Sequence, residues 1–161
     1  MKIICTLLVI IFGLIQTFPS EKSENHILVS GTNVFMIPPP SFESSDEPKG
    51  FRNAESGSFI MVEKSPESSA SEMLKSLSEM SGHPSFKINS RTDIHVSGFK
   101  GFFFDIEQYG AGIWISNQML VVENDEAFTL INGVCPIDSV QLKEKIKESI
   151  YSTYMDSEID W

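Results

Sequence analysis

Asp105 and Glu107 are two carboxylates that lie two positions apart within an apolar stretch of the chain. Residues two apart in a β-strand share a face, so we expect these carboxylates about 7 Å apart on one surface. That spacing suits a glycosidase-like acid pair or two ligands of one cation. A solvated outer face also explains the pattern. We favour it because Glu123, Asp125 and Glu126 lack the alternating carboxylates of a calcium loop, and we assign the pair no catalytic role.

The other residue types that do chemistry are scattered along the chain. No His-Glu-x-x-His or Cys/His zinc spacing includes any of the three histidines, His26, His83 and His95. Cys135 is the only cysteine beyond the first twenty residues, so we expect no internal disulfide and a buried thiol. Serines are abundant, but none stands in a Gly-x-Ser-x-Gly elbow. The sequence therefore predicts no metal site, no cofactor and no catalytic motif.

The elements that would position these residues are mainly strands. The strongest predicted strand runs from Phe99 to Tyr109, because Phe102, Phe104 and Ile106 fall on one face. Further strands are predicted at 27–29, 34–37, 58–64, 86–88, 94–96, 113–115, 119–122 and 128–134. Two helices cannot supply the crossovers of a parallel sheet. We therefore predict an α+β fold, with an antiparallel, meander-rich sheet of about six to eight strands flanked by two main helices and with a wholly apolar interior.

The two helices are predicted from apolar residues at helical spacing. The first has Ser65 as its N-cap, Pro66 at its first position and Gly82 as its C-cap. The second follows a predicted capping box at residues 138–141. Its apolar stripe consists of Leu142, Ile146 and Ile150. Both helices are expected to pack on the sheet.

A polar segment from Pro38 to Gly57 is predicted as a loop of about twenty residues, because Pro, Gly, Ser, Asp and Glu dominate it. Loops of that length in compact domains tend to be functional or mobile. Its two phenylalanines are expected to pin it to the body of the domain. The predicted binding residues on this loop are Phe42, Glu43, Asp46, Glu47 and Phe51.

The start of the chain has the three regions of a secretory signal: Lys2, an apolar run from Ile3 to Ile15, and a short polar segment that ends near Ser20. The apolar run would span roughly 20 Å as a helix, less than the about 30 Å of bilayer hydrocarbon, so we expect cleavage and no stable membrane span. The cut is expected within a few residues of Ser20. A cut after Ser20 itself would place bulky Phe18 where a small residue is preferred.

Removal of residues 1–20 leaves one predicted domain, residues 21–155, and an acidic tail, residues 156–161. Export implies a secreted or periplasmic protein. The chain has 12 basic and 22 acidic residues and a net charge of −10. Its one lysine cluster, Lys143, Lys145 and Lys147, is interleaved with glutamates. This charge disfavours nucleic acid and anionic membrane surfaces as partners.

The order of the elements is similar to that of the PsbP-like sandwich family. The resemblance is carried by Gly31 to Pro39, by the strand from Phe59 to Val62 with the helix after it, and by Gly98 to Gly101 leading into a meander and a terminal helix. Known members include an extrinsic lumenal subunit of photosystem II, a Ran-binding nuclear import factor and exported bacterial proteins of unknown role. The resemblance implies a non-enzymatic binding module. No ligand-binding motif of the family is present here from which residue roles could be carried over.

These observations favour an exported, non-enzymatic binding or accessory module whose partner is a protein, while its oligomeric state is left open. One alternative is a secreted hydrolase whose site is assembled only in the fold, around Asp105 and Glu107. Another is a carrier of a small apolar ligand. The aromatic residues Phe102, Phe103, Phe104, Tyr109 and Trp114 would line its cavity, although we expect them to fill the core.

Overall fold

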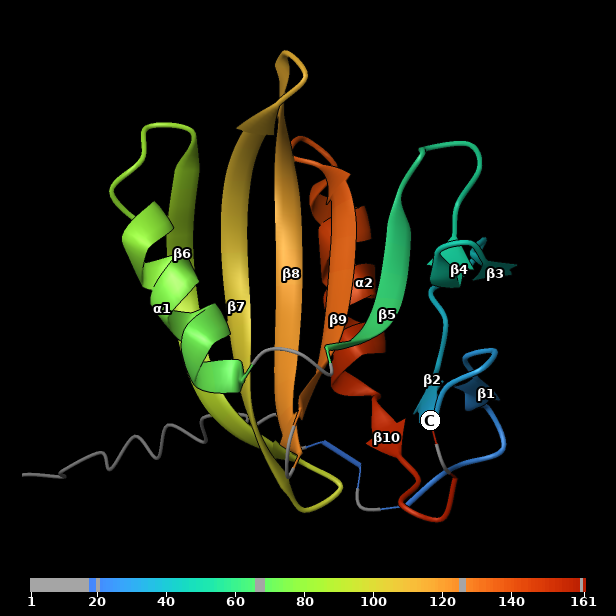
Figure 1. Cartoon of the computed structure of the whole chain (residues 1–161). Helices are drawn as coiled ribbons and strands as arrows, with labels where there is room; N and C mark the ends of the chain where they lie inside the picture. The colour runs from blue at the N-terminus through green and yellow to red at the C-terminus, as the bar shows by residue number, and fades with distance from the viewer. Residues whose placement is uncertain (1–17, 20, 66–68, 125–126, 160) are drawn as a thin grey trace, which may run out of the picture.

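The computed structural model describes residues 18–19, 21–65, 69–124, 127–159 and 161. Ten strands and two helices occur in these ranges (Figure 1). In chain order they are β1 (Ile27–Leu28), β2 (Val34–Met36), β3 (Glu43–Asp46), β4 (Lys49–Arg52), β5 (Phe59–Ser65), α1 (Ala70–Met80), β6 (Phe86–Val96), β7 (Phe99–Gly110), β8 (Ile113–Asn124), β9 (Ala127–Pro136), α2 (Val140–Tyr151) and β10 (Tyr154–Met155). The predicted α+β class is confirmed.

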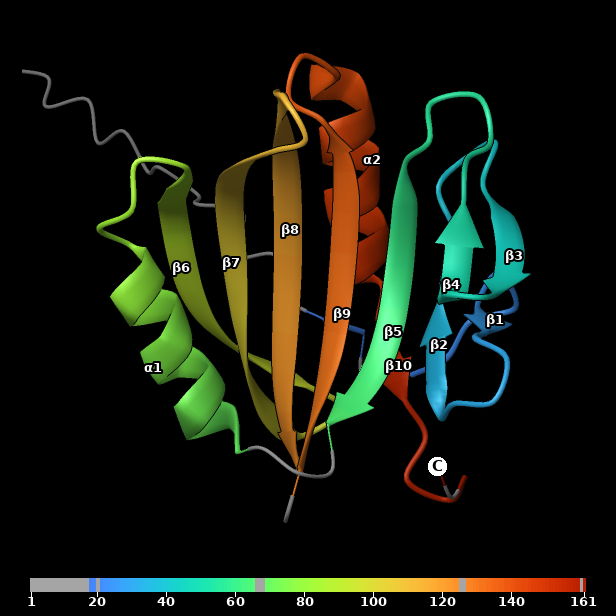
Figure 2. The same cartoon turned by 45° about the horizontal axis from the view of Figure 1, so that its top comes forward.

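The strands form two antiparallel sheets. The larger has seven strands in the order β3-β4-β5-β9-β8-β7-β6, and the smaller has the order β1-β2-β10. Strands β6 to β9 are consecutive neighbours, which confirms the predicted meander. Helix α1 lies across one face of the large sheet and α2 across the other, as Figures 1 and 2 show. The sheet is therefore the middle layer of a sandwich.

Each face of the large sheet has its own apolar core. Phe102, Phe104 and Ile106 of β7 pack with Leu77 of α1, whereas Phe103 belongs to the core under α2. That second core also contains Leu120, Ile131, Ile146 and Ile150. The alternation along β7 and the stripe on α2 predicted these contacts correctly. Alternate residues of one strand thus bind two different helices.

Two pairs of predicted short strands are single long strands. β6 continues through residues 89–93, with a register shift between Ile88 and Ser90, and β8 continues through Ser116 and Asn117. The prediction of separate strands at 86–88 and 94–96, and at 113–115 and 119–122, was therefore wrong. Ser116 and Asn117 are paired on both sides, by β7 and β9, so ladder hydrogen bonds outweigh the turn preference of polar residues.

The helix ends also differ from the predicted ones. Ser65 is the last residue of β5, and the N-cap of α1 is Ser69, whose hydroxyl accepts from the Glu72 N–H while the Glu72 carboxylate accepts from the Ser69 N–H. Predicted Pro66 lies outside the described residues. The C-cap is Ser81, not Gly82. Helix α2 has Ser139 as its N-cap without a side-chain bond, so the predicted capping box at 138–141 was wrong.

The segment predicted as a loop from Pro38 to Gly57 contains the β3–β4 hairpin, so that prediction was wrong. β4 pairs with the edge of β5, and Phe51 lies opposite Ile60. Gly50 adopts φ +143°, and a Cβ at this position would overlap the Ile60 carbonyl. Phe42 and Phe51 are buried, which confirms that they pin the segment to the body. The apolar contacts of two phenylalanines thus order an otherwise polar stretch.

Candidate functional site

Asp105 and Glu107 lie on the side of β7 that faces α2, and each has its own partner. The Asp105 carboxylate forms an ion pair with Lys143 of α2 at 2.9 Å, and about a fifth of each side chain is exposed. Glu107 lies 3.3 Å from the Lys87 ammonium and accepts a 2.9 Å hydrogen bond from the Asn89 amide. The two carboxylates are thus bound to different elements rather than directed at one common point.

The environment of Glu107 keeps this side chain ionised. The hydrogen bond from Asn89 lowers its pKa, and Lys87 lowers the pKa further, whereas partial burial opposes both effects. A general acid at neutral pH needs a raised pKa instead. Neither carboxylate lines any of the hollows described below. The geometry therefore gives the hydrolase interpretation no support.

Cys135 is buried, as the sequence predicted. Burial raises the pKa of its thiol to about 11, with a smaller contribution from Asp105 and an opposing one from Lys143. A neutral, enclosed thiol is a poor nucleophile and a poor metal ligand. Within the described ranges, no three His, Cys, Asp or Glu side chains lie close enough together to hold a metal ion.

The core under α2 is not wholly apolar, contrary to the expectation from the sequence. Gln118 of β8 lies between Asp105 and Gly133 across the sheet and is 1% exposed. Its amide oxygen and nitrogen have no protein partner among the described residues, and the same holds for the hydroxyl of buried Ser116. Such groups usually bind ordered water. This polar row supports α2 without opening onto a hollow.

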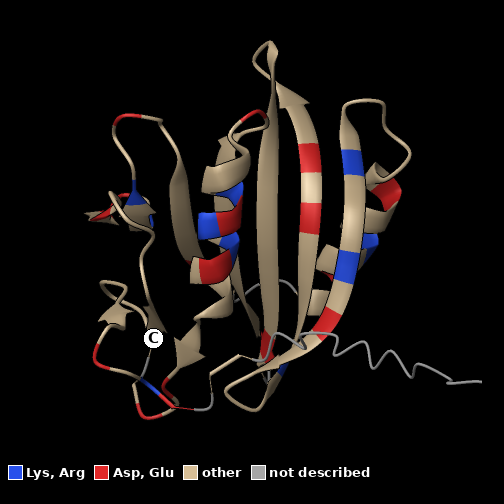
Figure 3. Ribbon diagram, turned by 180° about the vertical axis from the view of Figure 1, so that it is seen from behind, with Lys and Arg blue, Asp and Glu red and all other residues tan. Residues whose placement is uncertain are grey.

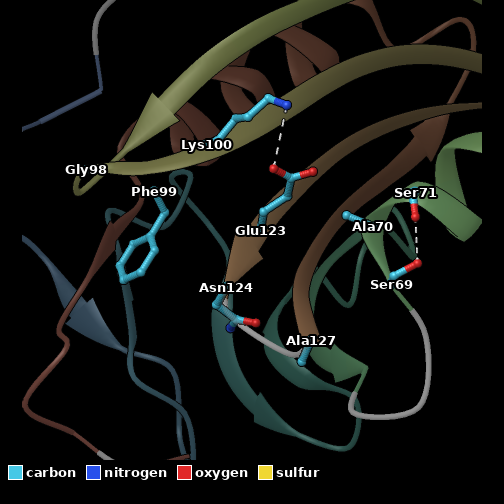
Figure 4. A pocket seen from close by; sticks show the side chains of 9 residues that line it. All are labelled: Ser69, Ala70, Ser71, Gly98, Phe99, Lys100, Glu123, Asn124 and Ala127. Atoms are coloured by element: carbon cyan, nitrogen blue, oxygen red, sulfur yellow. Dashed lines mark hydrogen bonds and ion pairs between the residues drawn. The ribbon is translucent and has the colours of Figure 1, made fainter.

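An open groove of about 550 Å³ lies between the start of α1, the start of β7 and the neighbouring ends of β8 and β9 (Figure 4). Four of its polar side chains contact one another in two pairs. Lys100 is 3.7 Å from the Glu123 carboxylate, and the hydroxyls of Ser69 and Ser71 are 2.7 Å apart. Phe99 points away from the ion pair in Figure 4. Asn124 also lines the groove, and its side-chain oxygen has no hydrogen-bond partner among the described residues. One amide oxygen beside two pairs of polar groups that contact each other does not define a ligand site.

A more apolar hollow, of about 760 Å³, lies beside the end of β5, where β4 pairs only as far as Met61. Its apolar walls are Val62, Met73, Phe128, Leu130 and Trp161. Two lysines at its rim are already bonded: Lys49 donates to the Gly31 carbonyl at 3.0 Å, and Lys64 donates to the Trp161 carbonyl. Phe102 and Phe104 line no described hollow, because α1 packs directly on them. The carrier interpretation thus lacks its predicted walls.

Four large apolar side chains are exposed at one end of the large sheet. Tyr109 is 45% exposed, Ile113 58% and Trp114 38%, and Val140 at the start of α2 is 66% exposed. We call these four residues the apolar end. The Tyr109 and Trp114 rings are 5.4 Å apart, and the Ile137 N–H donates to the Trp114 carbonyl, which ties the start of α2 to the hairpin.

The β7–β8 hairpin holds Tyr109, Ile113 and Trp114 of the apolar end clear of the body. It projects beyond its neighbours in Figure 1, and no charged residue colours its turn in Figure 3. Gln108 to Val122 contains no Lys, Arg, Asp or Glu. Ala111 and Gly112 have φ values of +51° and +86°, as tight two-residue hairpins require. The prediction that Tyr109 and Trp114 fill the core was wrong. Their place beside a Gly-Ala-Gly turn was the signal for exposure.

The residues predicted to bind a partner on the β3–β4 segment divide into two groups. Phe42 and Phe51 are buried in the core and cannot reach a partner. Glu43, Asp46 and Glu47 are exposed on the outermost strand and its turn. Only these three acidic side chains therefore remain available as a contact surface.

Comparison with known proteins places the fold. No family model and no curated protein sequence matches the chain. Solved structures do: cyanobacterial PsbP from Synechocystis sp. PCC 6803 has a TM-score of 0.54 at 8% identity, with 81% of this chain and 91% of that chain covered. LpqN of Mycobacterium tuberculosis, involved in cell envelope biogenesis, has a TM-score of 0.54 at 14% identity, with 76% of this chain and 82% of that chain covered.

A third solved structure, a protein of unknown function from Pseudomonas aeruginosa, has a TM-score of 0.52 at 12% identity, with 76% of this chain and 82% of that chain covered. The chain therefore has a PsbP-like fold. At such identities the likeness is one of fold, and fold alone does not determine function. Within the described ranges, neither helix is long and apolar enough to cross a membrane.

Proposed function

We propose that this chain is an exported, non-catalytic binding module that contacts a protein partner through the apolar end. The observation that carries the proposal is the exposure of Tyr109, Ile113, Trp114 and Val140 at one end of an otherwise acidic molecule. Exposed aromatic and aliphatic clusters mark interaction sites, and Tyr and Trp are enriched among residues that dominate binding energy. The hairpin tip is joined to its neighbours by two backbone hydrogen bonds, from the Tyr109 N–H to the Ser85 carbonyl and from the Ile137 N–H to the Trp114 carbonyl.

The chemistry of the surface supports a protein over other partners. Nucleic acids and anionic lipids need clustered cations, and the β7–β8 hairpin from Gln108 to Val122 contains none. The carboxylate pair and the Cys135 thiol lack the geometry for catalysis, as described above. Among the neighbours in fold, LpqN acts in cell envelope biogenesis. This supports, by analogy, a secreted or periplasmic location for this chain.

The acidic side chains of the β3–β4 hairpin are proposed as a second, separate contact. Glu43, Asp46 and Glu47 are exposed, while buried Phe42 and Phe51 hold the hairpin on the body. Charged residues on an outermost strand also prevent strand-to-strand aggregation. Reversal of these charges would weaken binding if the partner contacts this edge, and would leave binding unchanged if they only protect it.

Site-specific photo-crosslinking in the exporting cell tests the proposal. A photo-reactive amino acid at position 111, within the turn, is expected to crosslink one protein. Trp114→Ser is expected to abolish the product. The matched control is the same amino acid at position 27, because Ile27 is also an exposed aliphatic residue but lies on β1. Equal products from both positions, or a product that survives Trp114→Ser, would contradict the apolar end as the contact.

A further inference from the structure

Phe18, within the predicted leader, packs on the folded body. Its ring stacks on Tyr151 of α2 with centroids 4.9 Å apart and an interplanar angle of 26°. The Tyr151 ring in turn packs on Phe103, a core residue of β7, with ring centroids 5.0 Å apart. Phe18 is half-buried and belongs to the rim of the core under α2. It therefore extends an aromatic row that begins inside the domain.

The surroundings of Phe18 are built from elements far away in the sequence. Phe18 and Pro19 line a hollow of about 320 Å³ together with His95, Ser97, Gly98, Tyr154, Met155 and Ser157. Ser97 at the β6–β7 turn accepts a 2.8 Å hydrogen bond from the Met155 N–H, so the wall behind Phe18 is itself fixed. In Figure 1 the blue start of the described chain runs between the lower end of the sheet and β10. This part of the leader segment thus has a defined place.

We infer that the mature exported chain retains Phe18, because the leader is cut on the N-terminal side of this residue. The inference rests on the proposed export and concerns its processing site. The packing of Phe18 carries it, because a cut after Ser20 would remove the ring that covers Tyr151. A cut after Ser20 places bulky Phe18 at the third position upstream, and a cut after Thr17 places Ile15 there, so the preference of signal processing for a small residue does not favour Ser20.

Retention of Phe18 adds an anchor to the mature domain. The aromatic row of Phe103, Tyr151 and Phe18 joins β7, α2 and the mature N-terminus. Burial also raises the pKa of Tyr151, in agreement with a covered phenol ring. The first residues of the mature protein therefore belong to the folded body.

The first measurement is the N-terminal sequence and intact mass of the full chain recovered outside the cytoplasm of an exporting cell. The expected mature N-terminus is Phe18 or a residue upstream of it. A mature N-terminus at Pro19 or beyond would overturn the inference. A chain that keeps its first residues and stays in the cytoplasm would overturn both the inference and the proposed export.

A second measurement separates Phe18 packing from export. Phe18→Ala is expected to lower the Tm by about 5 °C, because it removes a stacked, half-buried ring. Phe18→Tyr keeps the ring and is expected to restore the Tm to within about 1 °C. Leu28→Ala, at an exposed apolar residue of β1, is the matched control and should change the Tm little. An unchanged Tm in Phe18→Ala would overturn the packing of Phe18 on which the inference rests.

Discussion

Gly133 lets α2 approach β9 closely, and Gly133→Ala tests this contact. A Cβ at position 133 would overlap Cγ2 of Ile146 and lie 3.1 Å from Cδ1 of Ile150. Both isoleucines are fully buried, so neither can move into solvent. The helix must shift to admit the methyl group. Because α2 begins with Val140, such a shift would also disturb the apolar end.

The expected cost follows from two opposing effects. Overpacking a filled core costs about 1–3 kcal/mol. Gly133 does not have a positive φ, so alanine also restricts the unfolded chain, which contributes about 0.4–1 kcal/mol in the opposite direction. The net loss is about 1–2 kcal/mol. In a domain of this size that loss corresponds to a decrease in Tm of about 5 °C.

Urea unfolding of the wild type, Gly133→Ala, Ile146→Leu and the double variant measures this contact, with Gly82→Ala as a fifth protein for control. Ile146→Leu moves the branch away from Cβ and removes the methyl group that meets the new alanine. It should cost less than about 1.5 kcal/mol alone and should recover at least about 0.5 kcal/mol in the Gly133→Ala background. Gly82→Ala is the control, since no heavy atom would lie within 4 Å of its Cβ. A Gly133→Ala cost below about 0.5 kcal/mol, or a double variant with simply additive effects, would refute the packing argument.

Three further predictions concern the polar side chains under and beside α2. Lys143→Met should cost about 1–2 kcal/mol in urea unfolding, because it leaves Asp105 partly buried without its cation, and adding Asp105→Asn should recover part of that loss. The Glu107 carboxylate has a folded pKa below its ordinary value of 4.5. Its stabilising effect, measured against Glu107→Gln, should therefore be complete above about pH 5 and disappear as the pH falls through the folded pKa. Burial raises the pKa of Cys135 from 9.0 to about 11, so its thiol should react with a thiol reagent at pH 8 only as fast as the domain opens. The free energy of unfolding should fall as the pH rises from 9.0 towards 11, because the folded state holds the thiol proton more tightly than the unfolded state.

The sequence predicted the parts of the fold that depend on local periodicity. Phe102, Phe104 and Ile106 alternate with Phe103, and this pattern alone assigns the two faces of β7. Side chains alternate between the two faces of a strand whichever strands pair with it. The class, the meander and the helix stripe could therefore be derived without a structure.

The failures occurred where distant partners determine the conformation. Ser116 and Asn117 favour a turn locally, yet pairing with β7 and β9 keeps them in a strand. Phe51 orders the β3–β4 hairpin because Ile60 lies opposite it. Both conformations depend on pairing with another strand, and local sequence patterns do not predict which strands pair.

The candidate site depended on exposure, which composition does not reveal. Tyr109 and Trp114 have the residue types of a core, and only their position at the end of a projecting hairpin exposes them. Asp105 and Glu107 have the spacing of an acid pair, but α2 and β6 supply each with a separate cation.

The central claim is that the apolar end binds a protein, and titration of the crosslinked partner against the purified chain tests it most directly. Trp114→Ser is expected to weaken the affinity at least about 30-fold, as truncation of a dominant interface residue does. Ile27→Ser, at an equally exposed aliphatic residue elsewhere, should leave the affinity unchanged. Equal affinities of the wild type and Trp114→Ser would contradict the claim.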